Sequence, residues 1–342
     1  MAENRMQGGQ SGNPESLVEV KHLKTQFNTK NGIVTAIDDV NFTIKQGEVL
    51  GIVGESGCGK SVTSMSIMRL IPATSGKIAE GEVIFKGVDL LKKTEKEMRK
   101  IRGNEIAMIF QDSMTGLNPV LTVGNQLIET ITVHNKMSKK DAWNRAVEML
   151  VKVGIPSPEQ RMKEYPHQLS GGMRQRVMIA MALSCNASLL IADEPTTALD
   201  VTIQAQILEL MKELKKNTNT SIMLITHDMG VVAEMADHIM VMYAGKVVEY
   251  ADTESIFERP LHPYTKGLLA SIPKLTQSDD ERLFTIKGSV PSLRDMPEGC
   301  RFCTRCEEAD KRCHEEQPPL FAVNGSQVSC WKYEDKGGDQ DE

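Results

Sequence analysis

The sequence predicts an α/β fold built on a parallel sheet. Short apolar segments with the length of buried strands recur along the chain, and segments with helical periodicity lie between them. Alternation of this kind is typical of parallel sheets, because a helix returns the chain to the end where the next parallel strand begins. A glycine-rich turn directly after one of these strands marks a place where the backbone must bend tightly.

The first half of the chain contains the first strands and a helical region. Strands are expected at Leu17–Val20, Val40–Ile44 and Val49–Val53, and a helix from about Lys60 to Leu70. Between residues 111 and 185 strand patterns are scarce, and helices are expected at Thr122–Val133 and Lys139–Val153. We therefore expect a helical subdomain at about 111–185.

The second half returns to strand–helix alternation and then changes in composition. Strands are expected at Leu189–Ala192, Ile222–Ile225 and Ile239–Met242, with helices at about Val201–Lys216 and Met229–Met235. A proline-rich stretch from Pro260 to Pro297 leads into a C-terminal extension that carries most of the cysteines. The expected units are a main domain at 17–260 and an extension at 261–334.

Both ends of the chain are polar. Residues 1–16 and 335–342 contain too little apolar surface to offset the entropy of ordering them, so we expect both tails to be disordered. The N-terminal tail lacks the apolar segment of a signal peptide, and the longest apolar run, Val177–Leu183, is too short to span a membrane. A cytosolic protein is expected.

The charge balance disfavours nucleic acid as a partner. The chain has 40 Lys+Arg against 46 Asp+Glu, a formal net charge of −6. Nucleic-acid binding favours an excess of basic residues, because the partner is a polyanion. Nucleic acid is therefore not an expected partner.

A phosphate-binding motif follows the strand that ends at Val53. Residues 54–61 fit the pattern G-x-x-x-x-G-K-[ST], between a predicted strand and a predicted helix, as a P-loop requires. Glycines let backbone N–H groups fold around phosphate oxygens, Lys60 can reach the β- and γ-phosphates, and the Ser61 hydroxyl can bind Mg²⁺. The expected nucleotide-binding residues are Gly54, Glu55, Ser56, Gly57, Cys58, Gly59, Lys60 and Ser61.

A second motif is an acidic pair at the end of the strand that begins at Leu189. Buried on both faces, this strand would bring Asp193 beside the P-loop, where its carboxylate can hold Mg²⁺. Glu194 would then polarise the attacking water. By itself, an acidic pair after a strand is usually a turn with a helix cap.

The segment before the acidic strand favours a catalytic role for the acidic pair over a simple helix cap. Residues 169–176 read Leu-Ser-Gly-Gly-Met-Arg-Gln-Arg, in which Ser170 is a good N-cap and Gly171 and Gly172 let a helix N-terminus approach an anion. Together with the P-loop and the acidic pair, in this order, the segment resembles the signature sequence of ABC ATPases. The remaining motifs of that family are matched by Phe110-Gln111-Asp112, Ala198-Leu199-Asp200 and Thr226-His227-Asp228.

The resemblance covers about Leu17 to Glu258 and implies a fold and a chemistry. The fold would be an α/β P-loop ABC ATPase domain with a RecA-like core, an antiparallel β subdomain and a helical subdomain, followed by the small cysteine-bearing extension. The reaction would be attack of water on the γ-phosphorus of ATP, with Mg²⁺ and Lys60 stabilising the developing charge.

The resemblance also implies roles for single residues. Phe27 matches the aromatic that stacks on adenine, although by its residue type alone it could be a core residue. Gln111 would contact Mg²⁺ and the water and sense the membrane partner, and His227 would hydrogen-bond the γ-phosphate. Asp200 would cross a dimer interface. In relatives the signature helix of one subunit faces the P-loop of the other, so Ser170 with its two glycines would act in trans.

The region after the main domain indicates which subfamily of ABC ATPases the chain resembles. Residues 262–269, His-Pro-Tyr-Thr-Lys-Gly-Leu-Leu, and the cysteines beyond them are similar to the ATPase subunits of bacterial oligopeptide and dipeptide importers, and Gly32–Asp38 fits the same subfamily. This implies a peripheral protein at the cytoplasmic face of the cell membrane. Its partners would be a second, homologous ATPase, two transmembrane permease chains and an extracytoplasmic peptide-binding protein.

Three other functions compete with peptide import. Import of nickel or another solute is the nearest, because neighbouring branches of the family carry such cargoes. An ABC exporter is disfavoured by the C-terminal extension. A soluble ABC ATPase acting on DNA or ribosomes is disfavoured by the single cassette and the negative net charge.

Five of the seven cysteines lie between residues 300 and 330. In a reducing compartment such a cluster is typical of metal binding. The spacing of Cys300, Cys303 and Cys306, with Cys313 beyond, resembles part of a ferredoxin-type run. The family resemblance instead implies Cys300, Cys306, Cys313 and Cys330 as ligands of a [4Fe–4S] cluster. Zn²⁺ and a metal-free set of buried thiols are the alternatives.

Overall fold

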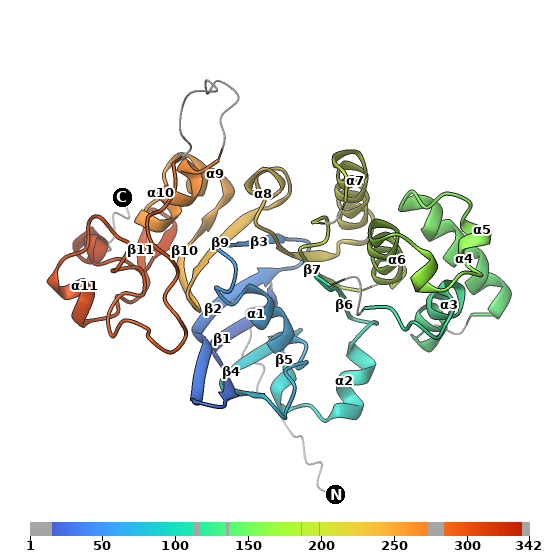
Figure 1. Cartoon of the computed structure of the whole chain (residues 1–342), viewed down its shortest axis with the longest axis horizontal. Helices are drawn as coiled ribbons and strands as arrows, with labels where there is room; N and C mark the ends of the chain where they lie inside the picture. Colours follow the sequence, from blue (N-terminus) through green and yellow to red (C-terminus); the bar gives the residue numbers. More distant parts are fainter. Residues whose placement is uncertain are drawn as a thin grey trace, which may run out of the picture.

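The computed structural model describes residues 16–112, 116–134, 137–185, 187–197, 199–272 and 284–336. Within them the strands form two sheets (Figure 1). The larger sheet has the order β11-β12-β10-β9-β3-β8-β7-β6, and the smaller has the order β2-β1-β4-β5. The chain is thus an α/β fold with a second, antiparallel sheet, as the sequence predicts.

The centre of the larger sheet is parallel. Strand β3 (Val49–Val53) lies between β8 (Ser221–Ile225) and β9 (His238–Tyr243) and is parallel to both. Strands β7 (Leu189–Asp193) and β6 (Ile106–Ile109) continue the parallel order beyond β8. Every residue of β3, β7 and β8 is buried. Burial on both faces explains the continuous apolar sequences by which these strands are predicted.

The smaller sheet consists of β1 (Ser16–Thr29), β2 (Gly32–Lys45), β4 (Gly76–Phe85) and β5 (Val88–Asp89). The predicted strands at 17–20 and 40–44 are parts of the much longer β1 and β2. Buried side chains of these strands, including Leu23, share one apolar cluster with Leu50 and Ile52 of β3. The antiparallel sheet therefore packs against the parallel one at the strand that leads into the P-loop.

A group of helices forms one end of the molecule (Figure 1). It contains α3 (Val123–His134), α4 (Lys139–Lys152), α5 (Pro158–Arg161), the short 3₁₀ helix η2 (Pro166–Gln168) and α6 (Gly171–Leu183). In α4 the buried side chains are Ala142, Ala146, Met149 and Leu150, which is the spacing of one apolar helix face. The helices predicted at 122–133 and 139–153 are confirmed.

The remaining helices flank the sheets. They are α1 (Lys60–Ile67), α2 (Glu95–Ile101), α7 (Val201–Thr218), α8 (Met229–Met235), α9 (Thr253–Glu258), α10 (Pro263–Ala270) and the 3₁₀ helix η1 (Leu90–Lys92). The predicted helix 60–70 ends earlier than expected, because Met68 is its C-cap and Arg69 takes a left-handed backbone conformation with φ of 52°.

The C-terminal extension continues the larger sheet. Strand β10 (Lys246–Asp252) pairs with β12 (Ser326–Val328), which pairs with β11 (Phe321–Val323). The helix α11 (Lys311–Glu315) and the 3₁₀ helix η3 (Trp331–Lys336) complete this end of the molecule. The predicted tails lie outside the described residues, apart from Ser16, which belongs to β1, and residues 335–336, which belong to η3.

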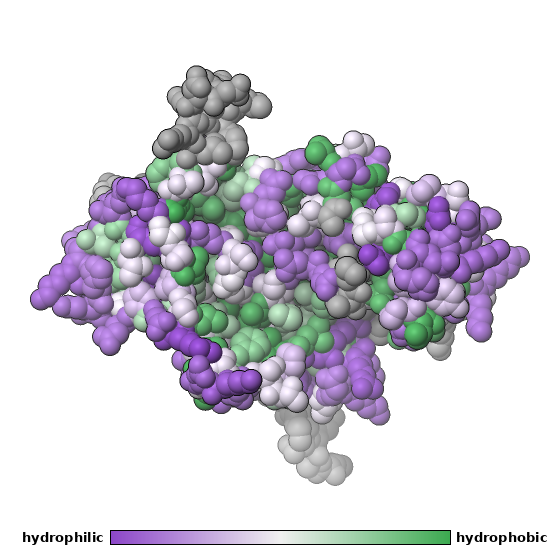
Figure 2. Space-filling model, viewed as in Figure 1, coloured by the Kyte–Doolittle hydropathy of each residue, from purple (hydrophilic) through white to green (hydrophobic). Residues whose placement is uncertain are grey.

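The viewed face is mixed in polarity at its middle and mostly hydrophilic at its ends. Figure 2 shows hydrophobic residues gathered in the lower middle of this face, with hydrophilic residues above them, and the helical end and the end formed by the extension are mostly hydrophilic. In the described part of the chain, no helix combines the length and the apolar character needed to cross a membrane.

The contact between the two sheets gives a stability prediction. Leu23 is fully buried, so Leu23→Ala leaves a cavity and is expected to lower the free energy of unfolding by about 2–5 kcal/mol. Ile33→Ala is the matched control, because Ile33 lies in the same sheet and is 61% exposed. Urea denaturation followed by circular dichroism measures both, and equal losses would show that the sheets do not depend on this contact.

Candidate functional site

The P-loop joins β3 to α1 and depends on its glycines. Gly54, Gly57 and Gly59 have φ angles of 150°, 77° and 106°, in the region that favours glycine. A Cβ atom on Gly54 would clash with the carbonyl oxygen of Met242 in β9. Glycine is therefore required at this position both by the backbone conformation and by the packing against the neighbouring strand.

The side chain of Lys60 spans the loop. It is 6% exposed, and its ammonium group donates hydrogen bonds to the carbonyl oxygens of Gly54 at 2.7 Å and Glu55 at 3.1 Å. The Cys58 sulfur lies 3.8 Å from the same nitrogen. Lys60 begins α1 and reaches back to the first residues of the loop. A buried positive charge is thus held where the loop can receive an anion.

Asp193 is the last residue of β7 and is 3% exposed. Burial raises the pKa of its carboxyl group, while a hydrogen bond with Ser61 acts in the opposite direction. Its Oδ1 atom is buried and has no hydrogen-bond partner among the described residues. A buried carboxylate oxygen left without a partner suits a cation ligand. Asp193 and Ser61 therefore fit the binding of Mg²⁺.

Glu194 and His227 meet at the ends of adjacent strands. Glu194 directly follows β7, and His227 lies two residues after β8. The Nδ1 atom of His227 lies 3.6 Å from Oε1 of Glu194, and the Thr197 hydroxyl donates to Oε2 at 3.1 Å. Glu194 has a left-handed backbone conformation, with a φ of 48°. Its backbone N–H donates a hydrogen bond to the carbonyl oxygen of Ile225 at 2.8 Å, which stabilises this conformation. Strained backbone of this kind is often found at functional sites.

Ser170 and Asp200 occupy helix N-termini. Ser170 is the N-cap of α6, and its hydroxyl accepts from the N–H of Met173 at 3.3 Å. Asp200 is the N-cap of α7 and accepts from the N–H of Ile203 at 3.0 Å. Both residues are exposed, and the half-buried Gly171 and Gly172 begin α6. This start of α6 belongs to the helical end of the molecule, whereas the P-loop follows the central strand β3 (Figure 1).

Gln111 and Phe27 come from two further strands. Gln111 lies two residues beyond β6 and is exposed. Phe27 is half-buried in β1, where a Cβ atom on Gly76 of β4 would lie 2.8 Å from its ring. Its ring therefore packs over a glycine and keeps part of its surface accessible.

One residue of the site lies within the segment 169–176 but was not predicted as a site residue. Gln175 of α6 is 1% exposed, and its side-chain amide donates to the carbonyl oxygen of Pro195 at 2.9 Å. Because Pro195 directly follows Glu194, this bond ties the helix that begins at Ser170 to the acidic loop. A glutamine within a helix is too common a feature to indicate such a contact.

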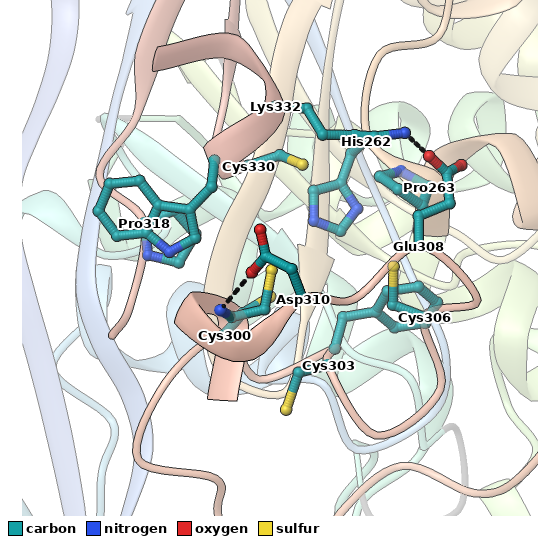
Figure 3. Close-up of a pocket in the computed structure, with 13 residues that line it drawn as sticks. His262, Pro263, Cys300, Cys303, Cys306, Glu308, Asp310, Pro318, Cys330 and Lys332 are labelled. Carbon is teal, nitrogen blue, oxygen red and sulfur yellow. Dashed lines mark hydrogen bonds and ion pairs between the residues drawn. The ribbon is translucent and has the colours of Figure 1, made fainter. Parts of the chain in front are cut away.

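The clustered cysteines line a single pocket near the start of α10. Cys300, Cys303, Cys306, Cys313 and Cys330 all border it, together with His262. All five are free thiols. In Figure 3 the sulfur of Cys303 points away from those of Cys306 and Cys330. An ion pair between Lys332 and Glu308 lies at one side of the pocket.

These thiols are of the chemical type that binds metals and border one pocket, but in this structure their side chains are not gathered around a common ion. Burial raises the pKa of Cys300 to about 12 and that of Cys313 to about 11, so a metal would have to displace their protons. Over the residues that the structure describes, no group of three or more His, Cys, Asp or Glu side chains is arranged to hold a metal ion. No chemical step is therefore assigned to a metal at this pocket.

Two family models match the chain. The model described as ABC transporter matches residues 37–197, which include the P-loop, the segment at Ser170 and the acidic pair. The model described as oligopeptide/dipeptide transporter, C-terminal region, matches residues 248–313.

A solved structure with a similar fold is a dimeric, post-hydrolysis state of the ATP-binding cassette MJ0796 bound to ADP and phosphate. It is 31% identical, with a TM-score of 0.64, and the match covers 69% of this chain and 98% of that one.

Curated relatives match over almost their whole length. The oligopeptide transport ATP-binding protein AppD of Bacillus subtilis is 56% identical over 95% of this chain and 99% of its own. The dipeptide transport ATP-binding protein DppD of the same organism is 54% identical over 93% of this chain and 95% of its own. The chain therefore belongs to the ATP-binding proteins of the ABC transporter family, in the oligopeptide/dipeptide branch.

Proposed function

We propose that this chain binds and hydrolyses ATP and that the hydrolysis powers import of oligopeptides or dipeptides through an ABC transporter. The observation that carries the proposal is the convergence of Lys60, Ser61 and the buried Asp193 at the ends of β3 and β7. Peptides are favoured as cargo because AppD and DppD are named for oligopeptide and dipeptide transport.

The residues of the P-loop would bind the phosphates. Its backbone N–H groups and the N-terminus of α1 face an anion favourably, and Lys60 adds a full positive charge. Ser61 and Asp193 would hold Mg²⁺, which when bound neutralises charge on the β- and γ-phosphates. Phe27 would stack on the adenine ring, and such contacts contribute about 0.5–1.5 kcal/mol beyond burial.

The residues after β6, β7 and β8 would act on the water and the γ-phosphate. Glu194 would accept a proton from the attacking water, and the nearby His227 would hydrogen-bond the γ-phosphate. Gln111, beyond β6, would contact Mg²⁺ and the water and respond to the membrane partner.

The complete site would be shared between two ATPase subunits. Ser170, Gly171 and Gly172 start a helix whose N-terminus is open to solvent, and Asp200 is also exposed. An exposed helix N-terminus can bind a phosphate that belongs to another subunit's P-loop. The dimeric state of the similar MJ0796 cassette supports this proposal. The second subunit would be a related ATPase, giving a heterodimer.

The assembly would place the chain at the cytoplasmic face of the membrane, as a peripheral subunit. Two permease chains and an extracytoplasmic peptide-binding protein would complete the transporter. Within the chain the proposed units are the ATPase domain at 17–260, with a helical subdomain at about 111–185, and the extension at 261–334.

The cysteine pocket would hold a [4Fe–4S] cluster through Cys300, Cys306, Cys313 and Cys330, with Zn²⁺ as the alternative. In support, the four thiols border one pocket, and thiolates are the ligands that both metals prefer. The cluster would crosslink a segment with a small core, a structural role apart from hydrolysis.

The first test concerns nucleotide binding. Lys60→Ala removes the buried cation of the P-loop and is expected to weaken binding of a fluorescent ATP analogue by more than about tenfold, about 1.4 kcal/mol. Lys212→Ala is the control, because Lys212 lies on α7 in an exposed ion pair with Glu234. Equal affinities of Lys60→Ala and the wild-type chain would refute the proposed function.

The second test concerns hydrolysis. Glu194→Gln keeps the size of the side chain but removes its basicity, so turnover by the assembled transporter should fall by about 10²–10⁴-fold while ATP binding is retained. Phosphate release measures the rate. Glu213→Gln, an exposed change on α7, should leave it unaltered. Turnover at the wild-type rate in the Glu194 variant would exclude this residue as the base.

The third test concerns the cysteines. Protein purified without oxygen is expected to be brown and to contain about four irons per chain. Serine at Cys300, Cys306, Cys313 or Cys330 should remove most of the iron, whereas Cys303→Ser is the matched control and should retain it. Metal analysis measures both iron and zinc. One zinc per chain would favour the alternative, and a chain without either metal would exclude a metal role.

A further inference from the structure

A turn of the C-terminal extension lies directly against the P-loop. Arg305, between two of the clustered cysteines, has a side chain that is only 3% exposed. Its two terminal nitrogens donate to the two carboxylate oxygens of Glu55, at 2.6 Å and 3.0 Å. This is the paired geometry in which a guanidinium group binds a carboxylate most strongly. Glu55 is the second residue of the P-loop.

The other hydrogen bonds of Arg305 fix its orientation. Nε donates to the carbonyl oxygen of Lys287 at 3.0 Å, Nη2 to that of Ile286 at 3.3 Å, and Nη1 to the Tyr243 hydroxyl at 3.3 Å. With the two bonds to Glu55, all five N–H groups of the guanidinium have acceptors. The group also lies 5.7 Å from the ring centre of Tyr243. Arg305 is therefore a rigid support.

Tyr264 of α10 holds the same residue at its backbone. Its ring is fully buried, and its hydroxyl accepts the N–H of Glu55 at 2.8 Å. The ring packs against Tyr243 and Phe302, with centres 4.7 Å and 5.5 Å apart. Glu55 is thus held at its N–H by Tyr264 and at its carboxylate by Arg305, while its carbonyl oxygen accepts from Lys60.

We propose that Arg305 and Tyr264 are positioning residues of the nucleotide site, which hold the first turn of the P-loop in the conformation that receives the phosphates. The proposal rests on the proposed function. A loop with three glycines at positive φ can take many conformations, and a ligand that must order it binds less tightly.

Arg305 has a second, electrostatic effect. Without it, the Glu55 carboxylate would be an unpaired negative charge on a loop that binds a polyanion. The guanidinium neutralises that charge at contact distance. The extension would therefore be a functional part of the ATP-binding unit, although it is separated from the P-loop by more than 200 residues of sequence.

The experiment measures binding of a fluorescent ATP analogue to the full chain. Arg305→Met is expected to weaken binding about tenfold and Tyr264→Phe about threefold. In the double variant Arg305→Met with Glu55→Gln, the unpaired negative charge of Glu55 is also removed. This variant should regain part of the affinity for the analogue. In the assembled transporter, both single variants should raise KM for ATP and leave kcat within about twofold.

Matched controls separate this role from general folding of the extension. Arg301→Met removes a half-buried arginine of the same turn, which pairs with Asp38 at 2.8 Å. This change keeps the bonds of Glu55 to Arg305 and Tyr264. Tyr333→Phe removes a hydroxyl that donates to the carbonyl oxygen of Leu261 at 3.0 Å. Both controls should bind the analogue within about twofold of the wild-type chain. Thermal unfolding checks that each variant is folded.

The outcomes distinguish the two proposals. The positioning role would be overturned if Tyr264→Phe and Arg305→Met bound the analogue with wild-type affinity. The proposed function would still stand if Lys60→Ala lost binding in the same assay. Normal binding by Lys60→Ala would instead refute the proposed function. If Arg305→Met does not fold, Tyr264→Phe decides, because it keeps the buried ring and removes only the acceptor of the Glu55 N–H. If the two control variants lost as much affinity for the analogue as Arg305→Met and Tyr264→Phe, the loss would be due to unfolding of the extension, and the positioning role would be refuted.

Discussion

The parallel alignment of β3, β8 and β7 is the constraint on which the site depends. Parallel strands end at the same edge of a sheet, so the loops that follow them meet there. The P-loop follows β3, Asp193 ends β7, and His227 comes after β8. Complete burial of these strands fixes their register, because any slip would expose apolar side chains or leave backbone groups without partners.

The site that results contains charges that the protein alone leaves incompletely compensated. Lys60 is buried against backbone carbonyl oxygens, and Asp193 has a buried oxygen without a partner among the described residues. Burial raises the pKa of Asp193, so above its ordinary pKa the ionised carboxylate costs stability. A bound cation would favour the ionised form and return that stability. The left-handed backbone conformation of Glu194, at the same edge of the sheet, costs further free energy of folding.

The extension is joined to this core by contacts of several kinds. Strand β12 pairs with β10, Arg301 pairs with Asp38 of the antiparallel sheet, and the buried rings of Tyr264 and Phe302 pack against Tyr243 at the end of β9. These contacts bury aromatic surface and pair the guanidinium group of Arg301 with a carboxylate. The same rings thus serve as the apolar core of the extension and as the support beneath the P-loop.

The sequence by itself determined the elements and motifs whose signal is local. The apolar runs of β3, β7 and β8, the periodicity of α4 and the spacing of the P-loop each follow from a few neighbouring residues. Strands β4 and β6 were not predicted, because β4 is partly exposed and β6 has only four residues.

Only the tertiary structure decided that Gln175 reaches Pro195 and that Arg305 and Tyr264 reach Glu55. Such contacts join residues far apart in sequence, and the packing of the whole chain, rather than any local pattern, brings them together.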